Sequence, residues 1–193
     1  MASGNPIILL AGLGNPGDRY AETRHNVGHW FIERLQREYA VNFKLEKKFK
    51  AETGYFAQGD QTIRIVVPNT FMNLSGQSIA PMAAFYRIPS EQILVIHDEL
   101  DLEPGIARLK SGGGHGGHNG LRDITLRLGT GNYCRLRIGI GHPGTERDVS
   151  SYVLSRPDLT QRKLIEDALD RSLAVLPDIL EGRFQQAMNT LHS

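Results

Sequence analysis

The sequence predicts an α/β fold: a single three-layer α/β/α domain, 1–193, with a mixed, mostly parallel sheet and a C-terminal pair of helices. Short apolar runs with the length of buried strands alternate along the chain with segments whose apolar residues recur at helical spacing. One pair of strand-like segments, 51–57 and 62–67, flanks Gln58-Gly59-Asp60-Gln61, a turn signal that predicts an antiparallel hairpin. The length of 193 residues suits one domain of ordinary size.

The first unit of the chain is predicted to be strand, loop, helix. Residues 7–13 form a continuous apolar run, typical of a buried strand, which Gly-Asn-Pro-Gly ends with strong turn formers. Residues 26–39 are expected to form a helix, with Thr23 as a cap shortly before it. The apolar residues at helical spacing are Val27, Trp30, Phe31 and Leu35.

The remaining elements follow from the same two patterns. Further buried strands are expected at 92–97, 106–110 and 135–140. Helices are expected at 75–86, 119–128, 158–176 and 178–191. Pro177 separates the last two helices, because proline interrupts a helix. In such sheets the ligand site lies beyond the carboxyl ends of the strands, so we expect the functional residues in those loops.

Composition excludes several classes of protein. The formal net charge is +1, so no overall positive field indicates nucleic-acid binding, although the segment 104–150 holds seven Lys and Arg against three Asp and Glu. Cys134 is the only cysteine, which excludes an internal disulfide and a multi-cysteine metal site. No apolar run approaches the roughly 18 residues that span a bilayer, and no signal segment is evident. We therefore expect a cytoplasmic protein without a membrane partner.

The loop after the first strand admits two interpretations. Gly12-Leu-Gly-Asn-Pro-Gly17 matches the G-x-G-x-x-G pattern of dinucleotide-binding loops. That pattern requires a helix to open at once toward the pyrophosphate, but Pro16 has no N–H and the helical pattern starts only near Asn26. A tight turn that displays Asn15 over the sheet is the better interpretation, and dinucleotide binding is the alternative.

A histidine and a carboxylate stand where predicted elements begin and end. His25 precedes the first helix, and Asp98 follows the strand at 92–97. A carboxylate there could hold the imidazole in one tautomer and raise its basicity; alternatively, His25 caps its helix and Asp98 belongs to a solvated turn. His25 and His29 have the spacing of a zinc-protease pair, but Asn26 replaces the glutamate and no third ligand is evident, so no metal is expected.

Two asparagines stand before or at predicted helix starts. Asn73 precedes the helix at 75–86, and Asn119 follows the glycine-rich run 112–117, which predicts a mobile or closely approached loop. By default each caps its helix, and the alternative is an amide that binds a peptide-like group. No G-x-S-x-G nucleophile motif is present, and Cys134 is expected to be a packing residue.

Six blocks of sequence, in this order, carry a resemblance to a known family. They are Gly12-Leu-Gly-Asn-Pro-Gly17, Thr23-Arg-His-Asn26, Thr70-Phe-Met-Asn-Leu-Ser-Gly76, His97-Asp-Glu-Leu-Asp-Leu102, Gly112-Gly-Gly-His-Gly-Gly-His-Asn-Gly120 and Arg135-Leu-Arg-Ile-Gly-Ile-Gly-His-Pro-Gly144. Together they resemble the bacterial peptidyl-tRNA hydrolases, over residues 7–188. The resemblance implies a monomeric α/β hydrolase, without metal or organic cofactor, that cleaves the ester between a peptide and the 3′-terminal ribose of tRNA.

The resemblance also implies roles for individual residues. His25 matches the catalytic base of the family and Asp98 the carboxylate that orients it. The family's active-site amides fall on Asn15, Asn73 and Asn119, of which Asn15 is placed with the catalytic pair. Its substrate-binding cleft falls on Tyr20 and Met72 together with Asn73 and Asn119, and its contacts to tRNA phosphate fall on Lys110 and Arg137. Two positions depart from the family: Arg108 and Val67 stand where relatives often have lysine.

The histidine, carboxylate and asparagines in these blocks suit ester hydrolysis independently of the family resemblance. An activated ester needs no covalent nucleophile if a histidine deprotonates water and amide donors meet the developing oxyanion. Amide side chains offer both a donor and an acceptor, which suits a peptide backbone whose side chains vary. The alternatives are a non-catalytic RNA-binding protein on the same scaffold and a deacylase of aminoacyl-tRNA or small esters.

Overall fold

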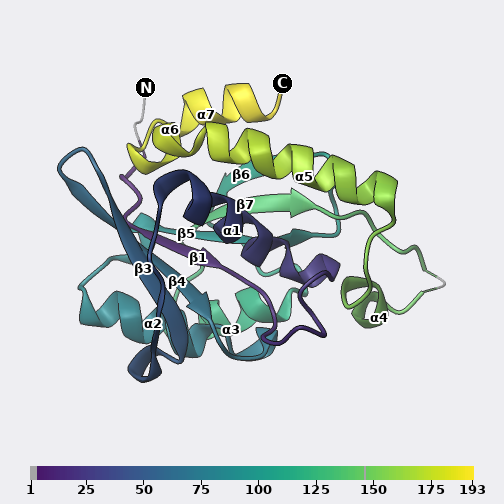
Figure 1. The fold of residues 1–193 in the computed structure, drawn as a ribbon, viewed down its shortest axis with the longest axis horizontal. Helices are drawn as coiled ribbons and strands as arrows, with labels where there is room; N and C mark the ends of the chain where they lie inside the picture. Colours follow the sequence, from purple (N-terminus) through teal and green to yellow (C-terminus); the bar gives the residue numbers. More distant parts are fainter. Residues whose placement is uncertain (1–3, 146) are drawn as a thin grey trace.

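One mixed β-sheet forms the centre of the molecule (Figure 1). The computed structural model describes residues 4–145 and 147–193. Its strands are β1 (Leu9–Gly12), β2 (Lys44–Glu46), β3 (Ala51–Gln58), β4 (Gln61–Pro68), β5 (Ile93–Glu99), β6 (Ala107–Ser111) and β7 (Cys134–Gly139). Within the described residues they form a seven-stranded sheet in the order β2-β3-β4-β1-β5-β7-β6. The predicted α/β class with a mixed sheet is confirmed.

Parallel pairing is confined to the middle of the sheet. β4, β1, β5 and β7 pair in parallel, whereas β2 with β3, β3 with β4, and β6 with β7 are antiparallel. The predicted hairpin is β3–β4, and its loop has only two residues because Gln58 pairs with Gln61. Gly59 has a φ of 58°, which glycine adopts without steric cost. The four parallel strands bring their carboxyl ends to one edge of the sheet.

Helices cover both faces of the sheet. The α-helices are α1 (Val27–Tyr39), α2 (Gly76–Phe85), α3 (Asn119–Leu128), α4 (Val149–Val153), α5 (Leu159–Ala174), α6 (Leu176–Leu180) and α7 (Phe184–Leu191). Short 3₁₀ turns are η1 (Arg24–Asn26), η2 (Lys47–Phe49), η3 (Met72–Leu74) and η4 (Ser90–Gln92). In Figure 1, α1, α5, α6 and α7 lie on one side of the strands, and α2 and α3 lie on the other.

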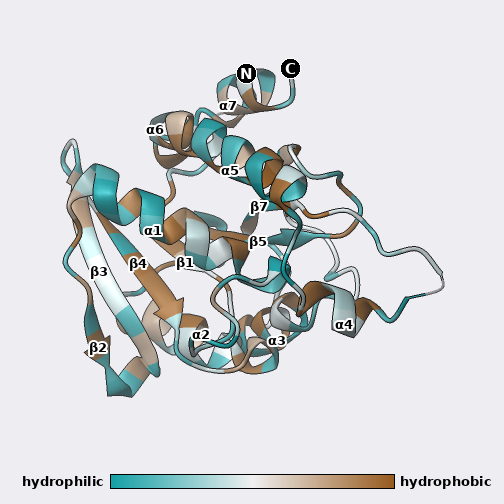
Figure 2. Cartoon of the chain, turned by 45° about the vertical axis from the view of Figure 1, so that its right-hand side comes forward, coloured by the Kyte–Doolittle hydropathy of each residue, from teal (hydrophilic) through white to brown (hydrophobic). Residues whose placement is uncertain are grey.

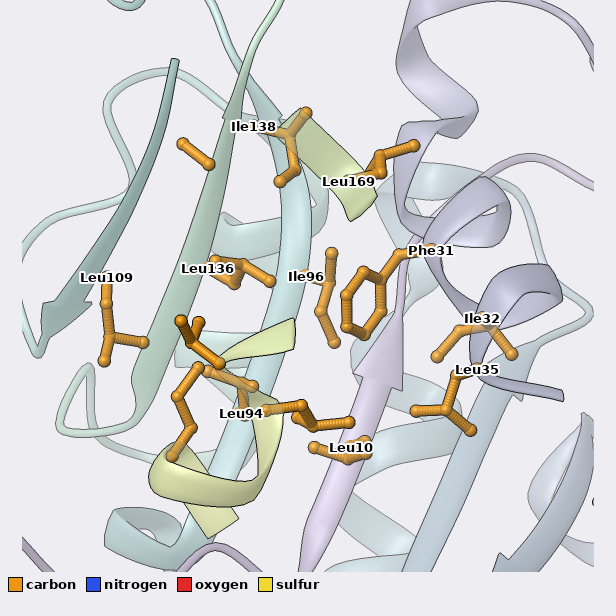
Figure 3. Packing of buried hydrophobic residues seen from close by; sticks show 14 of the residues in the cluster. Leu10, Phe31, Ile32, Leu35, Leu94, Ile96, Leu109, Leu136, Ile138 and Leu169 are labelled. Carbon is orange, nitrogen blue, oxygen red and sulfur yellow. The ribbon is translucent and has the colours of Figure 1, made fainter. Parts of the chain in front are cut away.

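The alternation of side chains along the strands divides the core into two layers. Leu10 and Ile96 face the layer of α1 and α5, while Leu9 and Val95, their chain neighbours, face α2 and α3. Figure 3 shows the first layer, where the fully buried Phe31 of α1 packs beside Leu10 and Ile96. Because both faces are covered, the central strands are continuous apolar runs, which is why the sequence pattern predicted them.

Hydropathy differs between the central strands and the helices that cover them. In Figure 2, β1 and β4 are coloured hydrophobic, whereas α1 and α5 mix hydrophilic and hydrophobic residues along their length. Among the described residues, no helix combines the length and the apolar character needed to cross a membrane.

The structure corrects three expectations about the elements. The second C-terminal helix does not run unbroken from 178 to 191: α6 contains Pro177 in its first turn, where proline is tolerated, and the break falls before α7, next to Gly182 at a φ of 77°. β2 and α4 were not predicted, because β2 carries exposed and charged residues and α4 is only five residues long. Asn73 caps no helix; it lies inside η3, and Ser75 holds the cap position of α2.

Candidate active site

A cavity of about 570 Å³ opens at the carboxyl ends of the parallel strands. The loop after β1, the end of β5, η1, η3, the start of α3 and α4 all contribute side chains to its wall. Of the residues assigned to the site from sequence, those that line it are Asn15, His25, Met72, Asn73, Asp98 and Asn119. Residues more than 100 positions apart in the chain therefore meet in one cleft, at the edge where an α/β sheet is expected to bind its ligand.

The Asp98 carboxylate bridges two imidazoles at the base of the cleft. Its Oδ2 lies 2.8 Å from Nδ1 of His25, and its Oδ1 lies 2.8 Å from Nε2 of His118. The Asp98 side chain is only 2% exposed. A buried carboxylate needs hydrogen-bond donors for both oxygens, and the two histidines supply them. The solvated-turn interpretation of Asp98 is wrong.

Hydrogen bonds define the tautomer of each imidazole. Nδ1 of His118 accepts from the backbone N–H groups of Gly120 and Leu121, at 3.1 and 3.3 Å, so its proton is on Nε2 and is donated to Asp98. His118 thereby also caps α3. His25 donates its Nδ1–H to Asp98, and its Nε2 is left to accept a proton. This is the arrangement of an oriented general base.

Burial and neighbouring charge have opposite effects on the pKa values of His25 and Asp98. Burial pulls the pKa of His25 downward, but the negative charge of Asp98 and its hydrogen bond outweigh this, so the net pKa of His25 is raised above its ordinary value of 6.5. Burial raises the pKa of Asp98, and the two histidines lower that pKa by more, to well below its usual range. Two other histidines behave differently: burial lowers the pKa of His29 to about 4 and, as the largest cause, that of His97 to about 3.

Hydrogen bonds hold both the backbone and the side chain of Asn15. The Asn26 side chain accepts from the backbone N–H of Asn15 and donates to its carbonyl, each at 2.9 Å. The Oδ1 of Asn15 accepts from the backbone N–H of Met72 at 2.6 Å. Because the oxygen of the amide is occupied, its NH₂ group is the part left for a ligand in the cleft. The tight-turn interpretation of this loop is supported: Gly17 has a φ of 99° and no helix follows at once.

Asn73 and Asn119 present exposed amides to the cleft from two neighbouring elements. Asn73 belongs to η3, and Asn119 is the first residue of α3; η3 and α3 pack against each other. The caps of the two following helices come from other side chains. His118 caps α3, and the N–H of Gly76, at the start of α2, donates to Asp123 at 2.8 Å.

A buried arginine forms hydrogen bonds with the glycine-rich loop before α3. Arg135 is 2% exposed and donates to the carbonyl of Gly113 at 2.6 Å, to that of Gly131 at 3.2 Å and to that of Gly114. Its guanidinium lies over the ring of Tyr133, with 4.5 Å from Cζ to the ring centroid. Four glycines of this loop have φ between 56° and 109°, a conformation that other residues rarely adopt, so the loop needs glycine for its backbone path.

The remaining predicted site residues lie outside the cleft lining. The ring of Tyr20 meets that of Phe71 edge-on, with 6.3 Å between centroids. Lys110 on β6 and Arg137 on β7 are on adjacent antiparallel strands and share one face of the sheet, as the register of Arg108 with Arg137 and Lys110 with Arg135 requires. Nε of Arg137 lies 3.1 Å from Oε2 of Glu99, which does line the cleft.

Three parts of this site were not predicted from the sequence. His118 had no assigned role, although it directly precedes Asn119 in the glycine-rich block. Asn26, whose side chain bonds the backbone of Asn15, lies in the matched block around His25, but its residue type alone does not indicate this role. The α4 wall, with Val149, Ser150, Val153 and Leu154, had no periodic signal.

Two histidines and one carboxylate also form a potential ligand set for a metal. Ligand atoms of His25, Asp98 and His118 all lie within 4.8 Å of one another, and within the described residues this set does not include His29, the partner that the sequence spacing suggested. Each nitrogen lies 2.8 Å from its carboxylate oxygen, whereas ligands of a tetrahedral zinc at about 2.0 Å are separated by roughly 3.3 Å. These distances fit shared protons better than a bound metal.

The chain is similar to known proteins over nearly its whole length. The family described as "Peptidyl-tRNA hydrolase" matches residues 9–193. Proteins named peptidyl-tRNA hydrolase from Histophilus somni (strain 2336) and Pseudomonas savastanoi pv. phaseolicola are each 53% identical over 188 residues, covering 97% of both chains. The crystal structure of peptidyl-tRNA hydrolase from Acinetobacter baumannii is 46% identical, with a TM-score of 0.93 over 97% of this chain and 95% of that one. The chain therefore belongs to the peptidyl-tRNA hydrolase family.

Proposed function

We propose that this chain hydrolyses the ester between the peptide and the 3′ ribose of peptidyl-tRNA, with His25 as the general base that activates water. The observation that carries the proposal is the contact between Nδ1 of His25 and Asp98, which leaves Nε2 as the proton acceptor in a cleft. The His25 side chain is 12% exposed and that of Asp98 only 2%, so the imidazole is the more accessible of the two groups.

The proposed reaction has two proton transfers. Nε2 of His25 takes a proton from water as the water oxygen attacks the ester carbonyl carbon, and the carbonyl oxygen becomes an oxyanion. The NH₂ group of Asn15 donates to that oxyanion, since its own oxygen is occupied by Met72. The tetrahedral intermediate then collapses, the bond to the ribose oxygen breaks, and His25 returns the proton to the leaving oxygen. Peptide acid and tRNA are released.

Two further amides are proposed to hold the peptide. Asn73 and Asn119 are exposed in the cleft, and each can donate to a carbonyl and accept from an N–H of the peptide backbone. The buried Met72 forms part of the same wall, and Tyr20 is proposed to contact the substrate from outside the cleft, beside Phe71. Recognition through the backbone makes the reaction tolerant of peptide sequence.

Contact with tRNA is proposed for Lys110 and Arg137. Both lie on the same face of β6 and β7, at the edge of the sheet, and Lys110 is exposed. The ion pair of Arg137 with Glu99 connects this face to the cleft wall. A small basic patch on a chain of net charge +1 favours release of the tRNA after each reaction. All proposed groups come from one chain, so a monomer suffices.

The activity is tested by comparing N-blocked with free aminoacyl-tRNA, each incubated with the purified protein with and without excess EDTA. We expect release of the blocked amino acid in preference to the free one, and no loss with EDTA. Preference for free aminoacyl-tRNA would support the deacylase alternative. Binding of tRNA without hydrolysis would support the non-catalytic alternative, and loss with EDTA followed by rescue with Zn²⁺ would overturn the proposed base mechanism.

A further inference from the structure

Helix α2 begins without a cap of its own. Ser75 holds the N-cap position but makes no side-chain capping bond; its Oγ donates to the carbonyl of Met72 at 2.7 Å instead. The first N–H of the helix, that of Gly76, is buried and donates to Oδ2 of Asp123 at 2.8 Å. Asp123 lies on α3, so the cap of one helix is supplied by the neighbouring helix.

Asp123 is held tightly in this position. It is 8% exposed, and both of its carboxylate oxygens lie 3.1 Å from Nε of Arg127, one turn further along α3. The negative carboxylate also faces the positive end of the α2 dipole. Only glycine permits the approach, because a Cβ at Gly76 would lie 2.6 Å from the carbonyl oxygen of Asp123.

This contact lies close along the chain to Asn73 and Asn119, the two amides proposed to bind the peptide. Asn73 is three residues before Gly76, and Asn119 is four residues, about one turn, before Asp123. With the cap supplied from α3, the Asn73 side chain is free of the capping role that its sequence position suggests and is exposed in the cleft. The same bond ties η3 and α2 to α3, and so ties the backbone that carries Asn73 to the backbone that carries Asn119.

We propose that Asp123 is a positioning residue: its bond to the N–H of Gly76 sets where Asn73 stands relative to Asn119, and so determines how well the peptide backbone is held. This rests on the proposed function, in which these two amides bind the peptide. Asp123 touches no substrate and acts through Asn73.

A double-mutant cycle on kcat/KM tests the proposal, with N-blocked aminoacyl-tRNA as substrate. Asp123→Ala is measured in the wild-type chain and in the Asn73→Ala chain. We expect Asp123→Ala to lower kcat/KM by about five- to tenfold in the wild-type chain and by less than about twofold in the Asn73→Ala chain, because coupled residues give non-additive effects. The loss should appear as a higher KM with kcat nearly retained. Equal loss in both backgrounds would overturn the proposal.

Two further variants keep the test decisive if Asp123→Ala does not fold. Asp123→Asn retains an acceptor for Gly76, and Gly76→Ala forces the helices apart while keeping the carboxylate. We expect the Gly76→Ala loss to be coupled to Asn73 in the same way, and Asp123→Asn to lose less than Gly76→Ala. An uncoupled Gly76→Ala loss would contradict the proposal. Arg162→Gln removes a comparable ion pair with Glu166, four residues along α5 and away from Asp123, and serves as the matched control with activity near wild type.

A second measurement is independent of activity. Amide hydrogen exchange at Gly76 should be faster in Asp123→Ala than in wild type, whereas exchange in β5 should be unchanged. Unchanged exchange at Gly76 would overturn the capping role itself. Wild-type chain without hydrolytic activity would refute the proposed function and leave this exchange result unaffected, so the two failures are distinguishable.

Discussion

Nδ1 of His25 lies 2.8 Å from Oδ2 of Asp98, although the two residues are 73 positions apart in the chain. The first stands in a 3₁₀ turn before α1, and the second near the end of β5. Their contact results from the parallel pairing of β1 with β5, which brings the loop after β1 and the end of β5 to one edge of the sheet. The catalytic proposal depends on this contact.

Replacing His25 by alanine should remove the base and leave the fold. We expect kcat to fall by about 10² to 10⁴, the range typical for loss of a general base. Steady-state kinetics with N-blocked aminoacyl-tRNA measures the effect, and circular dichroism checks folding. If the variant retains more than a tenth of wild-type turnover, His25 is not the general base.

The pH dependence of kcat/KM should report the titration of His25. Below its pKa the imidazole is protonated and cannot accept a proton, so activity should rise with pH through a midpoint above 6.5. Asp98→Asn removes the charge that raises this pKa and should move the midpoint to lower pH. Its loss of turnover should be smaller than that of His25→Ala, because water attack continues with a misoriented base. A flat profile from pH 5 to 8 in the wild type would contradict the assignment.

Replacing His118 by alanine should affect both stability and catalysis. It removes the cap of α3 and one of the two donors to the buried Asp98, at a cost of about 1–2 kcal/mol in the free energy of unfolding. Turnover should fall less than in His25→Ala, because Asp98 still bonds His25. Urea unfolding and kcat are the measurements. The control is His115→Ala, a cleft histidine whose Nδ1 only accepts from Gly117; equal effects of the two variants would contradict the role of His118.

Arg137→Ala should weaken tRNA binding and spare chemistry. Each phosphate contact releases counterions, so the slope of log K against log salt should flatten by about 0.7 to 1. KM should rise while kcat holds. A short 3′ fragment that does not reach the phosphate site should be cleaved equally by both proteins. Arg34→Ala is the control, since it removes a comparable ion pair with Asp170 on the other side of the sheet. Equal loss on the short fragment would show that Arg137 acts through Glu99 in the cleft.

Much of the fold could be predicted because its central elements carry local signals. The apolar runs of β1 and β5 are long enough to recognise, and the bounds predicted for α3, 119–128, are those observed. β2 carries no such signal, since its exposed residues are held by backbone pairing to β3 and not by burial of side chains. α4 is too short for a helical period to be visible.

By itself, the sequence determined which chemical groups are available: one histidine and one carboxylate at the ends of elements, and asparagines beside predicted helices. Only the tertiary structure decided what each group does. Asn73 was expected to cap its helix, yet Asp123 of α3 supplies that cap and leaves the amide in the cleft. His118 had no predicted role, yet it caps α3 and donates to Asp98. The role of a hydrogen-bonding side chain depends on which partner lies within about 3 Å of it. That partner is determined by the packing of segments distant in the chain, which no local sequence pattern encodes.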